Sequence, residues 1–445
     1  LSCSMKKRNY FFLGIGGIGN SALAQHFTSL GHLVAGYDRM PSSVTQKLEK
    51  NKLDVLYEFA PEKLPAFVDP ENTTIVCTAA IKQDQPWYQY FEKKGYLIEK
   101  RAHVLAQIAN AKTCVAVAGT HGKTSTLAIL SHIFKTAKQS FTAFVGGILQ
   151  GYESNYIHTG DSYILVEADE FDRSFLKLRP THAAITSIDP DHLDIYHSKK
   201  AFEKAFEDFA NQVETSLIVG PGVALEGLKL GTAATSPYRM ENSKLTEEGN
   251  RDDFHLRSPK SESFLVDVVG QHNLYNALTA AALATECGIS ISAIREALKS
   301  FRGIHRRMNI YPLHTNTIVV DDYAHHPTEI RAVFNTLNER YPELKKTVVF
   351  QPHLYSRTQN FLDAFATALS LFDQIYLLPI YPAREQPIPG VSSPALLDQI
   401  KQQNKGMISK EEIVSLGMHP NQGIIALLGA GDIGEVTANF KKVIA

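Results

Sequence analysis

Residues 113–125 read TCVAVAGTHGKTS, and this stretch decides the fold class of the 445-residue chain. Its first half, Thr113–Ala118, is a short apolar run that predicts a strand. A glycine turn follows, and the chain then continues as a predicted helix to about Ala137. A strand that enters a glycine turn and then a helix is the repeating unit of α/β proteins.

The glycine turn has the residue types of a phosphate loop, although it is short. Only two residues separate its glycines, where the usual G-x4-G-K-[ST] loop has four. Backbone N–H groups can still cradle phosphates, Lys123 can reach the β- and γ-phosphates, and the Thr124 hydroxyl can ligate Mg²⁺. A lysine at a helix start is unfavourable beside the helix dipole unless an anion is present. We therefore predict a nucleoside-triphosphate site formed by Gly119, Thr120, His121, Gly122, Lys123, Thr124 and Ser125.

The same strand–turn–helix pattern recurs on both sides of this stretch. A first block opens with the strand Tyr10–Leu13, and a third opens with the strand Thr317–Asp321. The polar residues 231–263 predict a loop-rich excursion of strands from the second block. The expected fold is α/β with three domains, each built on a mostly parallel sheet. The domains are a Rossmann-like N-terminal domain (1–108), a central P-loop ATPase domain (109–310) and a Rossmann-like C-terminal domain (311–445).

The composition indicates which kinds of binding partner and which cellular location to expect. Forty-five Lys and Arg residues balance 46 Asp and Glu residues, a net charge of −1 that argues against a nucleic-acid partner. No uncharged apolar run approaches the roughly 18 residues of a membrane span, so we expect neither a membrane span nor a signal peptide. The four cysteines form no CxxC pair, which favours a reduced, cytoplasmic location. We expect a monomer or a weak homodimer.

A second glycine loop, GIGGIG at Gly14–Gly19, lies between the first strand and a predicted helix. It satisfies G-x-G-x-x-G, and Asp38 follows about 20 residues later, as in dinucleotide-binding units. Such a loop holds a pyrophosphate at the helix N-terminus. NAD, FAD and a UDP-sugar all present a pyrophosphate and a ribose, so the ligand stays open, and a glycine turn needed only for packing is the alternative. The contacts would come from Gly16, Gly17, Ile18 and Gly19.

Acidic residues follow two predicted strands of the second block. Glu167 comes after the apolar run Tyr163–Val166, where a carboxylate would meet Mg²⁺, although such acids also cap helices. Residues 185–188 are predicted as a strand, and His192 lies among the carboxylates of the turn DPDHLD that follows. This histidine is a candidate ligand for a second metal ion, with a plain capping turn equally open.

Two asparagines begin an alanine-rich predicted helix in the segment GQHNLYNAL. Asn273 and Asn276 are three residues apart and therefore face the same way. Their amides match the donor and acceptor edge of adenine, while helix capping by one of them is the alternative.

Taken in order, GTHGKTS, EADE, DHLD, GQHNLYNAL, the RRM at Arg306–Met308 and DDYAHHPTEI resemble the Mur ligase family across all three blocks. These ATP-dependent amide-bond ligases build the peptide stem of peptidoglycan. GIGGIG, AHHPTE and FQPHLYSRT (350–358) are similar to the branch that joins L-alanine to UDP-N-acetylmuramate. The resemblance implies ATP and Mg²⁺ (or Mn²⁺) as cofactors, with these two compounds as substrates.

The resemblance also implies a role for individual residues. The implied catalytic residues are Lys123, Glu167, His192, Arg307 and His326. The implied metal ligands are Thr124, Glu167 and His192. ATP contacts would come from the phosphate loop together with Asn273, Asn276, Arg307 and Asp322. The UDP-sugar would contact Gly16, Gly17, Ile18, Gly19 and Asp38, and the amino acid would contact His325, His326 and Arg357.

The chain departs from the family pattern at two places. Asn20 follows GIGGIG where the resemblance leads us to expect Met. Residues 205–207 read AFE, without the carbamylated lysine of other Mur ligases, as in the L-alanine ligases as a group. Two alternative functions remain at this point. One is a murein tripeptide-recycling ligase, against which Glu329 and Arg357 argue, and the other is an NAD- or FAD-linked oxidoreductase that uses the first glycine loop.

Overall fold

The computed structural model describes residues 8–190, 193–196, 198–246, 249–258, 260–266, 268–383, 385–418, 420–437 and 440. The chain divides into two compact units. Unit 1 comprises Leu1–Asp267 and Asn276–Arg302, and unit 2 comprises Val268–Tyr275 and Gly303–Ala445. The described strands form three sheets, two in unit 1 and one in unit 2, so the predicted α/β fold is confirmed. No helix in the described ranges is long and apolar enough to cross a lipid bilayer.

The N-terminal sheet of unit 1 has the strand order β3-β2-β1-β4-β5, with every pair parallel. Both faces are covered, as parallel sheets require: Phe11 of β1 packs on Trp87, and Phe12 packs on Phe27. The strands are β1 (Asn9–Leu13), β2 (Val34–Tyr37), β3 (Asp54–Leu56), β4 (Thr73–Cys77) and β5 (Leu97–Lys100). The helices are α1 (Ile18–Ser29), α2 (Ser43–Lys50), η1 (Pro61–Lys63), α3 (Pro86–Lys93) and α4 (Arg101–Asn110).

The central sheet of unit 1 has the order β15-β14-β13-β12-β11-β10-β6-β9-β7-β8. Its strands are β6 (Thr113–Ala118), β7 (Phe141–Leu149), β8 (Ser154–His158), β9 (Tyr163–Glu167), β10 (His182–Ile185), β11 (Ser216–Val219), β12 (Leu228–Gly231), β13 (Tyr238–Thr246), β14 (Gly249–Leu256) and β15 (Glu262–Val266). The helices are α5 (Lys123–Thr136), η2 (Phe171–Lys177), α6 (Leu193–Tyr196), α7 (Lys199–Ala210), α8 (Gln271–Glu286) and α9 (Ile291–Ser300). The polar stretch forms the antiparallel strands β13–β15, which confirms the predicted excursion.

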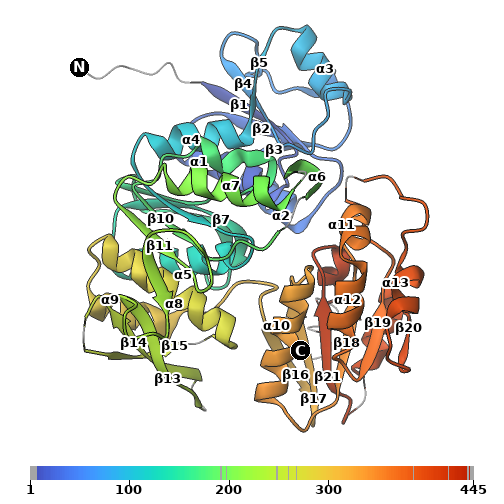
Figure 1. Ribbon diagram of the computed structural model, residues 1–445. Coiled ribbons are helices and arrows are strands. Elements are labelled where there is room, and N and C mark those ends of the chain that lie inside the picture. The colour runs from blue at the N-terminus through green and yellow to red at the C-terminus, as the bar shows by residue number, and fades with distance from the viewer. Residues whose placement is uncertain are drawn as a thin grey trace. The chain divides into compact units, whose positions relative to one another are not determined.

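One hydrophobic core joins the two sheets of unit 1. Helices α1, α4 and α7 supply Phe27, Val104 and Phe206 to this core, which also contains side chains of β1 and of β6. Figure 1 shows these helices between the two sheets. The helix that carries the first glycine loop is therefore packed into the same body as the phosphate loop.

Unit 2 is a six-stranded sheet of order β16-β17-β21-β18-β19-β20, parallel except for the β16–β17 pair. One face packs against α10, α12 and α13, and the other packs against α14 and η3. The strands are β16 (Asn309–His314), β17 (Thr317–Asp322), β18 (Lys346–Phe350), β19 (Gln374–Leu377), β20 (Lys405–Met407) and β21 (Gly423–Leu428). The helices are α10 (Pro327–Arg340), α11 (Tyr355–Asn360), α12 (Leu362–Leu369), α13 (Ser393–Gln399), α14 (Lys410–Leu416) and η3 (Asp432–Glu435).

The strand predicted at residues 185–188 was wrong, because β10 ends where that run begins. β10 is in register with β6, and Ile185 lies opposite Ala118, the last residue of β6. Beyond this pair the segments that follow β6 and β10 both leave the sheet. The Thr186 hydroxyl donates to the Ala118 carbonyl at 3.1 Å. The apolar character of Ile188 therefore does not reflect strand structure.

A buried histidine lies where α1 meets the central sheet. His26 is 6% exposed, and its ring packs against Phe144 and Tyr156, with centroid distances of 5.3 and 5.9 Å. Its Nδ1 lies 3.2 Å from the Tyr156 hydroxyl. Burial, with smaller contributions from His158 and His32, lowers the pKa of His26 to about 4. The ring is therefore neutral in the folded chain near neutral pH.

We predict that His26→Phe makes the stability of the chain less sensitive to acid. The pKa of His26 is lower in the folded chain than in the unfolded one, so its protonation favours unfolding as the pH falls from about 6.5 towards 4. At pH 5 this linkage costs the wild type on the order of 2 kcal/mol. Phenylalanine cannot bind this proton and keeps the aromatic contacts. Urea unfolding midpoints at pH 7.5 and pH 5 measure the effect, and equal losses in both proteins would contradict the prediction.

Candidate functional site

The phosphate loop leaves the sheet between two strands that also carry site residues. In the central sheet β6 pairs in parallel with β9 on one side and with β10 on the other. Val117 lies opposite Glu167, and Ala118 lies opposite Ile185. The carboxyl ends of the three strands therefore meet at one edge, where ligands bind in α/β sheets.

The loop itself is fastened to the turn that follows β10. The backbone N–H groups of Thr120 and His121 donate to the carbonyl and hydroxyl oxygens of Ser187, at 3.1 and 2.9 Å. The Thr120 hydroxyl donates to the Asp189 carbonyl at 2.7 Å. Ser125 follows in the first turn of α5. The structure thus brings the predicted phosphate-loop residues together in the geometry of a tight strand-to-helix turn.

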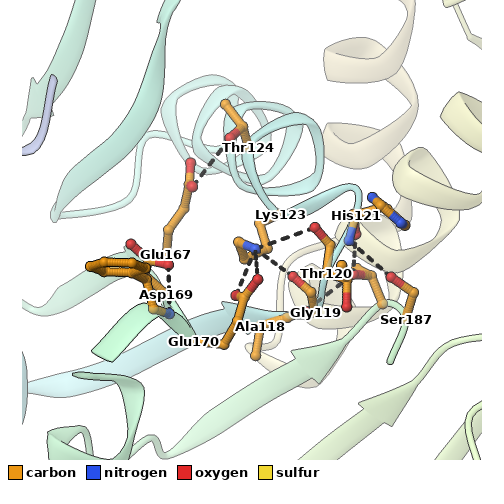
Figure 2. Close-up of polar contacts among 12 residues, drawn as sticks. Ala118, Gly119, Thr120, His121, Lys123, Thr124, Glu167, Asp169, Glu170 and Ser187 are labelled. Atoms are coloured by element: carbon orange, nitrogen blue, oxygen red, sulfur yellow. Dashed lines mark hydrogen bonds and ion pairs between the residues drawn. The ribbon is translucent and has the colours of Figure 1, made fainter. Parts of the chain in front are cut away.

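Lys123 is folded back onto its own loop and onto an acid. Its ammonium donates to both carboxylate oxygens of Glu170, at 2.7 and 3.0 Å, and to the Gly119 carbonyl at 2.5 Å (Figure 2). Burial alone would lower the pKa of Lys123, but the carboxylates of Glu170 and Asp169 outweigh this effect and raise the pKa. The lysine is therefore held in its charged form.

Thr124 and Glu167 form a pair of oxygen ligands beside the lysine. The Thr124 hydroxyl donates to Glu167 at 3.1 Å, and the Gly146 N–H donates to the other carboxylate oxygen at 2.5 Å. Burial raises the pKa of Glu167, and the Gly146 N–H and Lys123 oppose this shift. Hydroxyl and carboxylate oxygens are the donors that Mg²⁺ prefers. Within the described residues no group of three or more His, Cys, Asp or Glu side chains forms a metal cluster.

The remaining predicted metal ligand, His192, lies outside the described residues. Its role stays a prediction. Two oxygen donors at the predicted place are consistent with a Mg²⁺ site that is completed by further groups, as is usual where phosphates and water share the coordination.

The two predicted adenine-facing asparagines lie on α8, and the structure places Asn276 directly against the phosphate loop. A Cβ atom at Gly122 would lie 2.4 Å from the Asn276 Oδ1, and Gly122 also has a φ of +83°. A residue other than glycine would therefore both clash and be strained. The Thr126 hydroxyl donates to the same oxygen at 3.4 Å. Asn273, on the preceding turn, donates from its side-chain amide to the Val269 carbonyl at 2.8 Å, just before the start of α8.

The first glycine loop is held by two polar side chains. Asp38 accepts a hydrogen bond from the Gly16 N–H at 2.7 Å, so the predicted ribose ligand lies against the loop itself. Asn20 is fully buried, and its amide donates to the Leu13 and Gly14 carbonyls at 3.0 and 3.1 Å. The departure from Met at this position therefore has a structural reason, because the amide fixes the turn from β1 into the loop.

In unit 2 the structure brings Asp322 and Arg307 together. The Asp322 carboxylate accepts hydrogen bonds from the N–H groups of Met308 and Ala324, both at 2.7 Å. Burial raises the pKa of Asp322 to about 6, against the opposing effect of the Arg307 guanidinium. This guanidinium lies over the Tyr323 ring at 5.1 Å. Asp322 ends β17 at the carboxyl edge of its sheet, and its role in ligand binding stays a prediction.

The adjacent histidines have different surroundings. His326 is the N-cap of α10, and its Nδ1 accepts a hydrogen bond from the Thr328 N–H at 3.3 Å. His325 instead places its Nδ1 3.0 Å from the Tyr323 carbonyl. Glu329 accepts from the backbone N–H groups of both histidines, at 2.9 and 3.1 Å, and so fixes the turn.

Arg357 belongs to the same cluster of unit 2. It is 7% exposed, and its Nη1 lies 3.4 Å from the His353 Nδ1. The His353 ring in turn meets the His325 ring edge-on, with centroids 6.2 Å apart. The structure therefore brings two of the predicted acceptor residues, His325 and Arg357, next to His353.

Sequence reasoning missed two residues of the nucleotide site. Glu170, the partner of Lys123, stands in the quoted EADE segment, where only Glu167 was singled out. Its position at the end of an acidic run after a buried strand was the available signal. Gly146, whose N–H holds Glu167, lies in β7 and carries no local signal of such a role.

Family models of known proteins match three successive parts of the chain. The family model described as Mur ligase family, catalytic domain matches residues 9–113. The Mur ligase middle domain matches 117–284, and the Mur ligase glutamate ligase domain matches 306–432. The UDP-N-acetylmuramate--L-alanine ligase of Christiangramia forsetii is 44% identical, and the alignment covers 98% of each chain. That of Flavobacterium psychrophilum is 42% identical, with 98% of this chain and 97% of the relative covered.

Solved structures show the same architecture over the whole length. UDP-N-acetylmuramate-alanine ligase MurC of Thermotoga maritima has a TM-score of 0.83 at 28% identity, and the match covers 98% of both chains. A murein peptide ligase of Psychrobacter arcticus, at 21% identity and a TM-score of 0.71 over 98% of both chains, shares the fold.

We predict that Lys123→Ala lowers the rate of phosphate release from ATP by at least two orders of magnitude. The loss corresponds to about 3 kcal/mol of transition-state stabilisation, because the ammonium is placed to neutralise charge on the phosphates. Lys135→Ala is the matched control, since Lys135 is exposed near the other end of the same helix. Turnover retained in Lys123→Ala would show that the loop has only a structural role.

Proposed function

The chain belongs to the Mur ligase family, and we propose that it joins L-alanine to the lactyl carboxylate of UDP-N-acetylmuramate with hydrolysis of ATP. The observation that carries this proposal is the presence of two glycine loops in one packed body, unit 1. A ligase that activates an acid on a nucleotide-linked substrate uses both loops. An NAD- or FAD-linked oxidoreductase would use the first loop and would leave the Lys123 loop without a role.

The three predicted domains divide the work. Residues 1–108 would bind the UDP-sugar through Gly16, Gly17, Ile18, Gly19 and Asp38. Residues 109–310 would bind the ATP phosphates, and residues 311–445 would bind the amino acid and the ATP ribose, the latter through Asp322. The product enters peptidoglycan synthesis, on which cell shape and cell division depend. Since both ATP and nucleotide-linked sugars are cytoplasmic compounds, we place the activity in the cytoplasm.

The chemistry follows from the charge of the substrate. A carboxylate is a poor electrophile, because it repels the electrons of an amine and offers no good leaving group. Attack of a carboxylate oxygen on the γ-phosphorus of ATP forms a new P–O bond and releases ADP, which gives an acyl phosphate. The amine of L-alanine then attacks the carbonyl carbon, and inorganic phosphate leaves as the amide forms.

Residues of unit 1 would stabilise the first step. Lys123 would pair with the transferred phosphoryl oxygens, and the backbone N–H groups in the first turn of α5 would hold the remaining phosphates. Thr124 and Glu167, with His192, would hold Mg²⁺, which when bound neutralises negative charge on the phosphate oxygens. Asn276 would contribute to the adenine contacts.

The second step requires that the amine of L-alanine lose a proton, and the geometry favours His325 over His326 as the base. The Nδ1 of His326 accepts a backbone hydrogen bond, so its neutral form carries the proton on Nε2. The Nδ1 of His325 faces the Tyr323 carbonyl at 3.0 Å and the Glu329 carboxylate at 3.2 Å, which places the proton on Nδ1 and the lone pair on Nε2. Closure around the substrates would exclude water, which hydrolyses acyl phosphates.

The acceptor distinguishes this activity from that of a murein tripeptide-recycling ligase. Arg357 is a buried guanidinium next to His353, and a guanidinium can pair with the carboxylate of an amino-acid acceptor. Glu329 fixes the turn that carries both histidines. Both residues belong to motifs by which the chain resembles the L-alanine ligases, and on that ground they favour L-alanine over a tripeptide.

Phosphate release from ATP with each component omitted in turn tests the proposal. We expect release only when UDP-N-acetylmuramate, L-alanine and Mg²⁺ are all present, since the acyl phosphate needs the first compound and turnover needs the second. Full release without the UDP-sugar would defeat the proposal. Turnover with the tripeptide and none with L-alanine would reassign the chain to the recycling reaction.

We predict that Arg357→Ala mainly raises the KM for L-alanine, because a guanidinium pairs with the carboxylate of the acceptor. Arg357→Lys keeps the charge but loses the planar fork and should recover part of the affinity. Arg331→Ala, at an exposed position on α10, is the control. The measurement is the initial rate against L-alanine concentration at saturating ATP. An unchanged KM for L-alanine beside a raised KM for ATP would assign Arg357 to phosphate binding.

A further inference from the structure

All the donors of the Lys123 ammonium are engaged by the chain itself. An ammonium has three N–H donors. Four acceptor atoms surround this one: the two Glu170 oxygens, the Gly119 carbonyl and, at 3.4 Å, the Thr120 carbonyl (Figure 2). In this arrangement no N–H group of Lys123 remains for a phosphate.

Glu170 is held in place by the fold. Its side chain is 3% exposed, and its backbone carbonyl accepts a hydrogen bond from the Tyr196 hydroxyl at 2.6 Å. Tyr196 is buried, and the Arg173 guanidinium lies over its ring at 5.3 Å. Glu170 is also the N-cap residue of η2, whose Arg173 N–H donates to the same carbonyl. Glu170 therefore has a fixed backbone position and a buried side chain, and its contact with Lys123 is not one made by a mobile surface residue.

A buried acid in this position competes with a nucleotide. A phosphate-loop lysine reaches the β- and γ-phosphates when nucleotide is bound. Because the three N–H groups of Lys123 are already shared among these four acceptors, an incoming polyphosphate must displace at least one of them, and Glu170 supplies two of the four. The negative charge of Glu170 also repels that polyphosphate at short range.

We propose that Glu170 is a positioning residue that acts as an anionic placeholder for the terminal phosphates of the nucleotide. It holds Lys123 in the nucleotide-free chain and weakens nucleotide binding by competing for the same ammonium. This inference rests on the proposed ATP site but does not depend on the identity of the amino-acid acceptor.

Nucleotide affinity of Glu170→Gln tests the proposal. Titration calorimetry with ADP and with a non-hydrolysable ATP analogue, in the presence of Mg²⁺ and without UDP-sugar or L-alanine, gives the Kd. Glutamine removes the charge at nearly constant shape, so we expect binding to tighten about tenfold. A residue with a merely structural role would weaken binding when replaced, so the direction of the change is diagnostic. Equal or weaker binding in Glu170→Gln would overturn the proposal.

Asp169→Asn is the matched control for the loss of one negative charge. Asp169 stands in the same acidic segment, its side chain is 43% exposed, and its Oδ1 accepts from the Phe171 N–H at 3.1 Å, a bond that asparagine can keep. Its carboxylate acts on Lys123 only through the electric field. We expect less than a twofold change in Kd. A change as large as that of Glu170→Gln would mean that general charge, and not the contact with Lys123, sets the affinity, and would overturn the proposal.

Melting temperatures test the coupling of Lys123 and Glu170 independently of nucleotide binding, which is needed if a variant folds poorly. Lys123→Met leaves the Glu170 charge buried without its partner and should lower the Tm of the nucleotide-free chain. The double variant with Glu170→Gln removes both charges and should melt higher than Lys123→Met alone. A double variant that melts no higher would show that the two side chains are not coupled, which contradicts the placeholder role.

The outcomes separate this inference from the proposed function. If the wild-type chain binds no adenine nucleotide, both the proposed ATP site and the proposed ligase activity are wrong. If the wild-type chain binds nucleotide and Glu170→Gln binds it with the same Kd, only the proposed placeholder role is wrong.

Discussion

The parallel pairing of β6 between β9 and β10 is the constraint on which the nucleotide site depends. Because Val117 lies opposite Glu167 and Ala118 lies opposite Ile185, the three strands end at one edge of the sheet. A glycine turn can then begin at that edge with an acid on one side and the Ser187 turn on the other. Shifting any of these strands by one residue would turn its side chains to the other face and take them out of reach.

The same rule organises unit 2. Asp322 ends β17 opposite Leu428 of β21, and Phe350 ends β18 opposite the same residue. The turn with the two histidines leaves the sheet directly after β17, and the segment leading to Arg357 leaves directly after β18. Residues about 30 positions apart in the sequence are thereby gathered at one edge by strand pairing alone.

The site concentrates charge where burial is costly. Burial raises the pKa of Glu167, Glu170 and Asp322, and each carboxylate is compensated by a cation or by backbone N–H groups. Such an arrangement contributes little to the stability of the fold, because the desolvation of each charge offsets much of the attraction. Its value lies in preorganisation, since a phosphate or a metal ion meets groups that are already oriented.

Local sequence patterns determined which segments are strands, turns and helices, and where the two glycine loops lie. Apolar runs followed by glycine and then by helical periodicity depend only on neighbouring residues, so β6, α5 and the turn between them could be predicted. The strand expected at 185–188 was wrong because only Ile185 lies in β10, while Thr186 and Ser187 form hydrogen bonds with the end of β6 and with the phosphate loop. The partner of Lys123, 47 residues away, and the contact of Asn276 with Gly122 were decided only by the tertiary structure. Strand order and helix packing set these distances, and no local pattern of residues encodes them.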